Sequence, residues 1–301
     1  MMSYEYNFIM SFNNRKKSNA KKWIVIILSI VLLILLTLFV FIIYKDSKEL
    51  EYAKSIEQES IAIKEKQKRD EEEAEKKRLI NSKDLTPEQI SNIENIYSLE
   101  EKSAFLTFDD GPTSAVTPFI LDYLKQENIK ATFFVLGNRV KANPDLIKRE
   151  FEEGHYIANH GYTHKYSQIY AKTQNVLEEY NYTETAIQEA LENPDYHSRV
   201  FRFPGGSVGG YYSRIKSQAK ELLKQNNIAS LDWNALNNDA DGAHTKEALM
   251  ENVIKTIGNK NSVVILMHDA ADKILTYETL PELVQYLRDN GYTFKNLYDV
   301  L

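Results

Sequence analysis

The sequence contains no cysteine. Disulfide bonds and thiolate ligands are therefore excluded, and any bound metal must be held by histidine, aspartate or glutamate side chains. An excess of positive charge is also lacking, because the formal net charge at pH 7 is −6. A nucleic-acid-binding protein is expected to present a basic face. The composition thus argues against a nucleic-acid partner.

Charged residues are absent from residues 23–44, which consist mainly of Ile, Leu, Val and Phe. A helix of about 20 apolar residues crosses the ~30 Å hydrocarbon core of a bilayer, so this segment is predicted to be a transmembrane helix. A cleaved signal peptide, the alternative, has an apolar region of about 7–15 residues and a small-residue cleavage site. The run here is longer and shows no such site, which favours an uncleaved anchor.

Basic residues lie just before the apolar segment, at Arg15, Lys16, Lys17, Lys21 and Lys22. Basic residues flanking a span remain in the cytoplasm. Residues 1–22 are therefore predicted to form a cytoplasmic tail of a single-pass protein in the cell membrane. Everything after residue 44 is predicted to be extracellular.

Residues 45–98 are predicted to form a charged helical stalk or linker. Glycine and proline are absent from residues 45–81, and opposite charges recur four residues apart: Lys66 and Asp70, Glu72 and Lys76, Glu73 and Lys77. Such pairs support a solvated helix. Dimerisation of the stalk as a coiled coil is an alternative, although few apolar residues are available for its seam. Thr86 and Pro87 have the pattern of a helix start.

Residues 99–301 alternate between apolar strand-like runs and helical patterns. Strands are predicted at 104–108, 131–136, 155–158, 200–203, 229–233 and 262–267, and helices at 117–127, 144–153, 213–225, 246–257 and 279–290. This alternation predicts an α/β fold with a mostly parallel sheet covered by helices, either open or closed into a barrel.

Two short strings carry the chemistry of a metal site. Residues 107–112 (TFDDGP) contain two adjacent carboxylates, and residues 160–164 (HGYTH) contain two imidazoles four residues apart. Two neutral imidazoles and one carboxylate bind a divalent metal and leave a coordination position for water. The second carboxylate is then free to act as a base.

Polar or charged residues follow the predicted strands at equivalent positions: Asp109, Asp110, His160, Arg202, Asp232 and His268. Parallel strands bring their carboxyl ends to one edge of the sheet, where active sites gather. These side chains are therefore expected to share one site. His155, His197 and His244 belong to no motif and are expected to be ordinary core or surface residues.

From about residue 104 onward, five ordered motifs resemble the polysaccharide deacetylases with a NodB homology domain, carbohydrate esterase family 4. The motifs are TFDDGP at Thr107, HGYTH at His160, RFPGG at Arg202, SLDW at Ser230 and LMHD at Leu266. The resemblance implies a NodB-type distorted (β/α) barrel. It also implies that Asp110, His160 and His164 are metal ligands and that Asp109 is the general base.

The same resemblance assigns the remaining roles. Arg202 would orient Asp109, His268 would be the general acid, and Asp232 would pair with His268. Gly205 would offer a backbone N–H to the oxyanion, while Trp233 and Leu266 would line the pocket for acetyl group and sugar. The chain departs from the family pattern at Gly205, where an aromatic is common. It departs again at Gly161, where Ser or Thr is commoner and could brace the metal loop.

The resemblance and the predicted anchor together imply a metal-dependent hydrolase of cell-wall glycan. The expected reaction removes N-acetyl groups, with N-acetylglucosamine of peptidoglycan as the substrate, and zinc is the expected metal. Histidine and carboxylate ligands also admit cobalt, nickel or iron. Two alternatives stay open: an O-deacetylase of acetylated polysaccharide, and an inactive glycan-binding domain.

Overall fold

The computed structural model describes residues 2–80 and 85–301, without the side chains of residues 2–27, 30 and 69–80. Helix α1 (Met2–Ile80) includes residues 45–80 of the segment that the sequence predicts as a charged helical stalk or linker. Two exposed ion pairs, Lys45–Glu49 at 3.7 Å and Lys48–Glu51 at 2.8 Å, lie along it. Exposed pairs of this kind add little stability. The three pairs predicted from the sequence include residues 70–77, whose side chains lie outside the described part.

Within the residues that the structure describes, no helix is both long and apolar enough to cross a membrane. The predicted transmembrane segment, residues 23–44, includes residues 23–27 and 30, whose side chains are not described.

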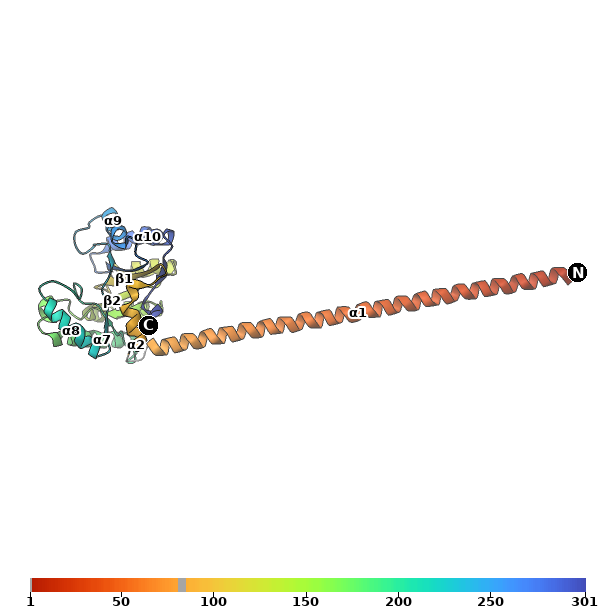
Figure 1. Ribbon diagram of the computed structural model, residues 1–301, viewed down its shortest axis with the longest axis horizontal. Coiled ribbons are helices and arrows are strands. Elements are labelled where there is room, and N and C mark those ends of the chain that lie inside the picture. Colours follow the sequence, from red (N-terminus) through yellow and green to blue (C-terminus); the bar gives the residue numbers. More distant parts are fainter. Residues whose placement is uncertain (1, 81–84) are drawn as a thin grey trace. The chain divides into compact units, whose positions relative to one another are not determined.

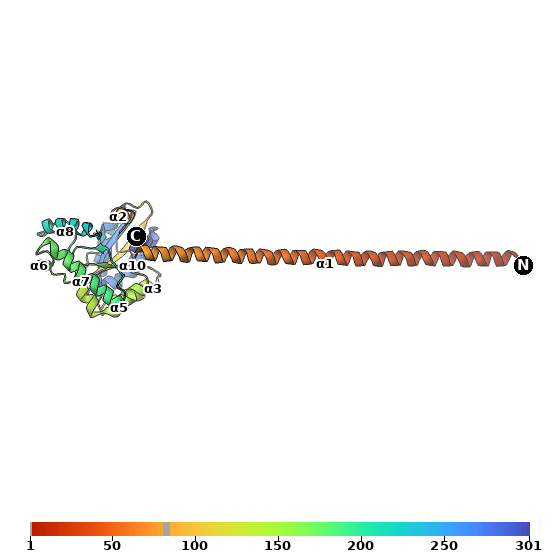
Figure 2. The same cartoon turned by 90° about the horizontal axis from the view of Figure 1, so that it is seen from below.

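The chain divides into two compact units, residues 1–74 and 75–301. The second unit contains a sheet of eight strands, of which seven follow the order β5-β4-β3-β2-β1-β7-β6. Figures 1 and 2 show this unit with its helices placed around the sheet. The strands are β1 (Ser103–Asp109), β2 (Thr132–Val135), β3 (Tyr156–Asn159), β4 (Val200–Phe201), β5 (Ala229–Ser230), β6 (Ala235–Leu236), β7 (Ser262–His268) and β8 (Thr293–Lys295). All the observed pairings are parallel. This parallel, barrel-like α/β sheet confirms the predicted fold class.

Helices separate most of the strands in the chain. They are α2 (Pro87–Glu94), α3 (Thr117–Gln126), α4 (Gly137–Ala142), α5 (Pro144–Glu152), α6 (Tyr166–Ile169), α7 (Thr173–Leu191), α8 (Ser213–Gln225), α9 (Lys246–Ile257) and α10 (Ile274–Asp289), with short 3₁₀ turns η1 (Ile96–Ser98) and η2 (Leu297–Asp299). The sequence patterns predicted α3, α5, α8 and α9 to within a residue at each end. They missed α7, the longest helix of this unit, as well as the short strands β6 and β8.

Alternation along β1 gives the sheet two different faces. Leu106 and Phe108 join a large apolar core with buried side chains of α3, α5, α7, α9 and α10. Phe105 points to the other face, and so do Thr107 and Asp109, because successive side chains of a strand alternate. Both faces of the strand are buried. A polar row therefore runs along the inner face of the sheet to the carboxyl end of β1.

A second apolar core covers the same inner face of the sheet, on the side of the polar row toward the amino end of β1. Phe105 and Phe134 belong to this core together with Leu85, Ile93 and Ile96 and with residues of the C-terminal turn η2. The Thr86 hydroxyl and the Gln89 side chain form a capping box at the start of α2, as the Thr-Pro pattern predicted. Residues 85–98, expected to be linker, thus contribute buried side chains to the folded unit.

Candidate metal centre and active site

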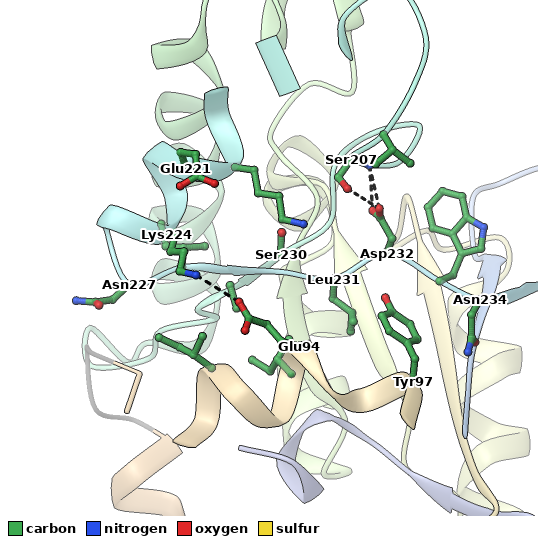
Figure 3. Close-up of a pocket in the computed structure, with 17 residues that line it drawn as sticks. Glu94, Tyr97, Ser207, Glu221, Lys224, Asn227, Ser230, Leu231, Asp232 and Asn234 are labelled. Carbon is green, nitrogen blue, oxygen red and sulfur yellow. Dashed lines mark hydrogen bonds and ion pairs between the residues drawn. The ribbon is translucent and has the colours of Figure 1, made fainter. Parts of the chain in front are cut away.

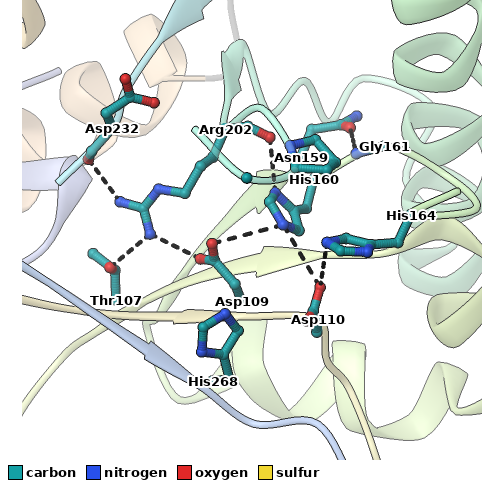
Figure 4. Close-up of polar contacts among 12 residues, drawn as sticks. Thr107, Asp109, Asp110, Asn159, His160, Gly161, His164, Arg202, Asp232 and His268 are labelled. Carbon is teal, nitrogen blue, oxygen red and sulfur yellow. Dashed lines mark hydrogen bonds and ion pairs between the residues drawn. The ribbon is translucent and has the colours of Figure 1, made fainter. Parts of the chain in front are cut away.

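Two loops at the carboxyl ends of β1 and β3 bring the carboxylates and imidazoles together. Asp110 directly follows β1, and His160 directly follows β3. Asp110 and His164 have left-handed backbone conformations, with φ of 74° and 59°. Such conformations are uncommon for residues other than glycine and cluster at functional sites. They turn both side chains toward a common point (Figure 4).

Asp110 Oδ1 lies 3.6 Å from His160 Nε2 and 3.4 Å from His164 Nε2. A tetrahedral metal with bonds of about 2.0–2.1 Å places its ligand atoms about 3.3 Å apart. The carboxylate oxygen thus lies at nearly this spacing from each of the two imidazole nitrogens. They form a group that could hold a metal, with all donor atoms within 4.8 Å of one another.

The protonation and hydrogen bonding of these groups also fit a metal. Asp110 Oδ1 is buried and accepts no hydrogen bond within the described residues, although buried carboxylate oxygens are normally paired. His160 Nδ1 lies 2.8 Å from the backbone oxygen of Arg202. Because that oxygen can only accept, Nδ1 carries the proton, and the free lone pair of Nε2 is available to a metal beside Asp110. Burial lowers the pKa of His160 to about 3, so its imidazole is neutral. The residues present therefore fit a divalent ion.

Asp109 lies beside this cluster and has a different set of partners. Its Oδ1 accepts a hydrogen bond of 2.8 Å from Arg202 Nη1, while its Oδ2 lies 3.7 Å from His160 Nε2. Burial raises the pKa of Asp109 above its ordinary value, and the Arg202 guanidinium opposes that rise. A carboxylate whose pKa is raised by burial, but which lies beside a cation, is suited to act as a general base. The predicted contact between Arg202 and Asp109 is present.

Arg202 is itself fixed on all sides. It is fully buried and donates hydrogen bonds to Thr107 Oγ1 at 2.8 Å, to the oxygen of Leu231 at 3.1 Å and to the oxygen of Asp232 at 3.0 Å. Its guanidinium lies over the ring of Phe134, 3.8 Å from the centroid. An arginine held this firmly positions the one carboxylate that it bonds.

The predicted pair of Asp232 with His268 is wrong, because His268 pairs with Asp239. Asp239 Oδ1 contacts His268 Nδ1 at 2.6 Å, and Asp239 Oδ2 accepts from the backbone N–H of His268 at 2.9 Å and from Thr276 Oγ1 at 2.6 Å. Burial alone would lower the pKa of His268, but the hydrogen bond and charge of Asp239 raise it to about 9. His268 therefore carries a proton at neutral pH.

Asp232 instead fixes the loop that follows Arg202. Its carboxylate accepts hydrogen bonds from the backbone N–H of Ser207 at 3.0 Å and from Ser207 Oγ at 2.6 Å (Figure 3). The sheet order explains the error. β5, which precedes Asp232, and β7, which ends at His268, are far apart in the sheet, whereas β6 pairs with β7 and leads the chain to Asp239.

The three predicted substrate contacts lie in different surroundings. Gly205 has a left-handed φ of +72°, and a Cβ there would lie 2.4 Å from Tyr166 Oη, so the position requires glycine. Trp233 lines a cavity of about 680 Å³ together with Asp232, Ser207 and other residues of α2, α8 and β5 (Figure 3). Leu266 is 7% exposed and shares the inner face of β7 with His268. Contact of these residues with substrate stays a prediction.

Glu179, on the unpredicted helix α7, braces the loop that carries His164. Its Oε2 accepts hydrogen bonds from the backbone N–H groups of Tyr162 and Thr163 at 2.6 and 2.7 Å, and its Oε1 accepts from Thr163 Oγ1 at 2.7 Å. Gly161, where the family pattern has a hydroxyl, has a φ of +83°. The bracing that the missing hydroxyl could supply thus comes from Glu179.

We expect Glu179→Ala to weaken metal binding about tenfold, because outer groups that orient metal ligands contribute 10–100-fold to affinity. Glu179→Gln keeps an acceptor oxygen and should lie between Glu179→Ala and the unmodified protein. Competition against a chromogenic chelator measures the dissociation constant. Glu178→Ala, which removes the exposed neighbour on the same helix, is the matched control. Equal affinity of Glu179→Ala and Glu178→Ala would show that the brace does not orient the ligands.

The fold and the site together define the class of protein. The site combines an Asp-His-His cluster, an adjacent carboxylate outside that cluster and a protonated histidine, all on a barrel-like parallel sheet. These are the parts of a hydrolase that uses a divalent metal and water. His155 and His197 lie outside this group: His155 is buried and accepts from the N–H of Ala131, and His197 contacts Glu184.

Comparison with known proteins identifies the family within this class. The family model for polysaccharide deacetylases matches residues 97–226. The chain is 34% identical to a peptidoglycan-N-acetylglucosamine deacetylase of Bacillus cereus over 203 residues. This matched stretch covers 66% of this chain and 71% of that protein. A structure of a Streptococcus mutans CE4 esterase matches with a TM-score of 0.61 and 31% identity, covering 71% of this chain and 91% of that one.

The chain therefore belongs to the polysaccharide deacetylase family. The peptidoglycan-N-acetylglucosamine deacetylase PgdA of Listeria monocytogenes is also similar, with 35% identity over 196 residues, which cover 64% of this chain. The chain spans only 37% of the length of that protein.

Proposed function

We propose that this protein removes N-acetyl groups from cell-wall glycan, with N-acetylglucosamine of peptidoglycan as the substrate. The observation that carries the proposal is the placement of three groups at one edge of the sheet: the Asp110-His160-His164 cluster, the Asp109–Arg202 pair and the Asp239–His268 pair. Two relatives named as peptidoglycan-N-acetylglucosamine deacetylases support the choice of sugar.

Asp110, His160 and His164 would hold the metal, for which zinc is the first candidate and cobalt, nickel or iron are alternatives. When bound, such an ion supplies Lewis acidity toward a carbonyl and toward water. Asp109 takes a proton from the attacking water, and Arg202 keeps its carboxylate turned toward that water. The acetamide C–N bond breaks as the tetrahedral adduct collapses.

His268 delivers the second proton. Because Nδ1 faces Asp239 at 2.6 Å, Nε2 is the atom that donates to the departing amine. The products are acetate and a free amino sugar. The N–H of Gly205 is proposed to stabilise the oxyanion, while Trp233 and Leu266 are proposed to contact the acetyl group and the sugar.

The proposal is tested by incubating the full chain, with its metal content measured, with intact peptidoglycan. We expect release of acetate and an equal amount of new primary amine. Acetate accompanied by new hydroxyl groups without amine would replace this proposal with O-deacetylation. Absence of acetate from a metal-loaded chain would contradict deacetylation of peptidoglycan.

We further propose that residues 23–44 anchor the protein in the cell membrane with the second unit outside. Support comes from the absence of charge in this segment and from the exposed apolar side chains between Leu28 and Tyr44. On fractionation, the full chain should sediment with membranes, whereas a chain that begins at residue 45 should not. Recovery of both in the soluble fraction would contradict the anchor.

A further inference from the structure

A tight turn, residues 203–206, directly follows Arg202. The N–H of Gly206 donates to the backbone oxygen of Phe203 at 2.8 Å. Pro204 at the second position and Gly205 at the third, with a φ of 72°, make it a type II turn. A type I turn has the same ends, and only its central peptide is turned over. Because glycine adopts negative and positive φ about equally, Gly205 by itself leaves both orientations open.

A buried tyrosine fixes the orientation of this central peptide. Tyr170 is 2% exposed, and its hydroxyl donates a hydrogen bond of 2.7 Å to the backbone oxygen of Pro204. The Pro204–Gly205 peptide is trans, so its oxygen and its N–H point in opposite directions. The bond to Pro204 therefore directs the N–H of Gly205 away from Tyr170. A carbonyl that accepts a hydrogen bond is also polarised, which strengthens the N–H of its peptide as a donor.

The N–H of Gly205 is available to a ligand. Gly205 is exposed, and within the described residues its N–H donates no hydrogen bond. A Cβ at this position would lie 2.4 Å from Tyr166 Oη, and the ring of Tyr166 lies 5.6 Å from the imidazole of His164. The donor therefore lies near the loop that carries a proposed metal ligand.

A buried lysine of α8 holds the other end of the turn. Lys216 is 4% exposed, and its Nζ donates to the backbone oxygens of Gly206 at 2.7 Å and Gly205 at 3.3 Å. The same Nζ lies 5.1 Å from the centre of the Tyr170 ring, and that ring belongs to an apolar cluster that includes Phe203. Lysine and tyrosine thus form one packed support for the turn, and loss of the tyrosine hydroxyl alone leaves the ring packing intact.

We propose that Tyr170 is a positioning residue for deacetylation: its hydroxyl holds the Pro204–Gly205 peptide in the orientation that presents the Gly205 N–H to the oxyanion. The inference rests on the proposed function and deepens it, because it explains how a glycine turn keeps a backbone donor preorganised. An oxyanion donor acts on the transition state far more than on the bound substrate. Loss of its orientation should therefore lower kcat and leave KM and metal content unchanged.

Tyr170→Phe in the full chain deletes the hydroxyl and keeps the ring. We expect kcat for acetate release from a soluble N-acetylglucosamine oligomer to fall about tenfold, which corresponds to about 1.4 kcal/mol, near the net strength of one hydrogen bond. Tyr196→Phe is the matched control, because Tyr196 is also buried and its hydroxyl donates to the backbone oxygen of Ile157 at 2.6 Å, in another core. Both variants should lose similar thermal stability, but only Tyr170→Phe should lose kcat. Equal kcat in the two variants would overturn the proposal.

The peptide itself gives a second readout that does not depend on turnover. Pro204–Gly205 is the single Pro-Gly pair in the sequence, so labelling proline carbonyls and glycine nitrogens with NMR-active isotopes gives one carbonyl–amide signal. This signal should move or split in Tyr170→Phe and stay in place in Tyr196→Phe. An unmoved signal in Tyr170→Phe would also overturn the proposal. Absence of acetate release by the unmodified chain counts against the proposed function, and the NMR signal alone then decides whether Tyr170 holds the peptide.

Discussion

Asp109→Asn is expected to lower kcat/KM for acetate release by about 10²–10⁴-fold, the usual contribution of a positioned general base. Asparagine has nearly the same shape as aspartate and can accept the bond from Arg202, but it takes no proton from water. The three proposed ligands remain intact, so metal content should stay that of the unmodified protein. Rates on a soluble oligomer and metal analysis on the same sample are the measurements.

The two neighbouring aspartates allow a sharp comparison. Asp110→Asn should lower both the metal content and the rate, because Asp110 Oδ1 faces both imidazoles. Asp195→Asn, at an exposed position, should change neither. Turnover that persists in Asp109→Asn would show that another group is the base. Loss of metal in Asp109→Asn would show that the two aspartates have been assigned the wrong way round.

Asp239→Asn should move the basic limb of the pH–rate profile to lower pH. The acid form of His268 is present below its pKa and lost above it, and Asp239 holds that pKa at about 9. Without the carboxylate, burial draws the pKa to or below the ordinary value of about 6.5. At pH 8 the fraction of protonated His268, and with it the rate, should fall at least about 30-fold.

Asp232→Asn is the matched variant for this experiment, since Asp232 contacts Ser207 and not His268. Its basic limb should stay near pH 9, and only the position of the 205–212 loop should be disturbed. The profile of kcat/KM between pH 6 and 10 separates the two carboxylates. A shift in Asp232→Asn with none in Asp239→Asn would restore the pairing predicted from the sequence.

The difference between these two aspartates shows where sequence patterns reach their limit. Asp232 lies in an apolar strand-like run and satisfies the rule that functional groups lie after strands, whereas Asp239 follows Asn237 and Asn238 and shows no such pattern. β6 is only two residues long, too short for an alternation pattern to reveal. Its parallel pairing with β7 decides which carboxylate reaches His268, and that pairing is a contact between distant parts of the chain.

Residues 85–98 illustrate a second limit. The helix start at Thr86 and Pro87 was readable, because capping involves residues close in sequence. The burial of Leu85, Ile93 and Ile96 was not, because their partners, such as Phe105 and Phe134, belong to strands that come later in the chain. A short amphipathic segment beside a charged helix has the same pattern whether it packs or stays in solvent.

The sequence by itself determined the parallel α/β class and the family resemblance. It also placed Asp109 beside Asp110, and His160 four residues from His164. These features depend on local spacing, which the chain carries with it. Only the tertiary structure assigned Asp239 to His268 and Glu179 to the metal loop. Each of those contacts joins residues from separate loops or helices, which meet because the strands and helices pack in one particular order.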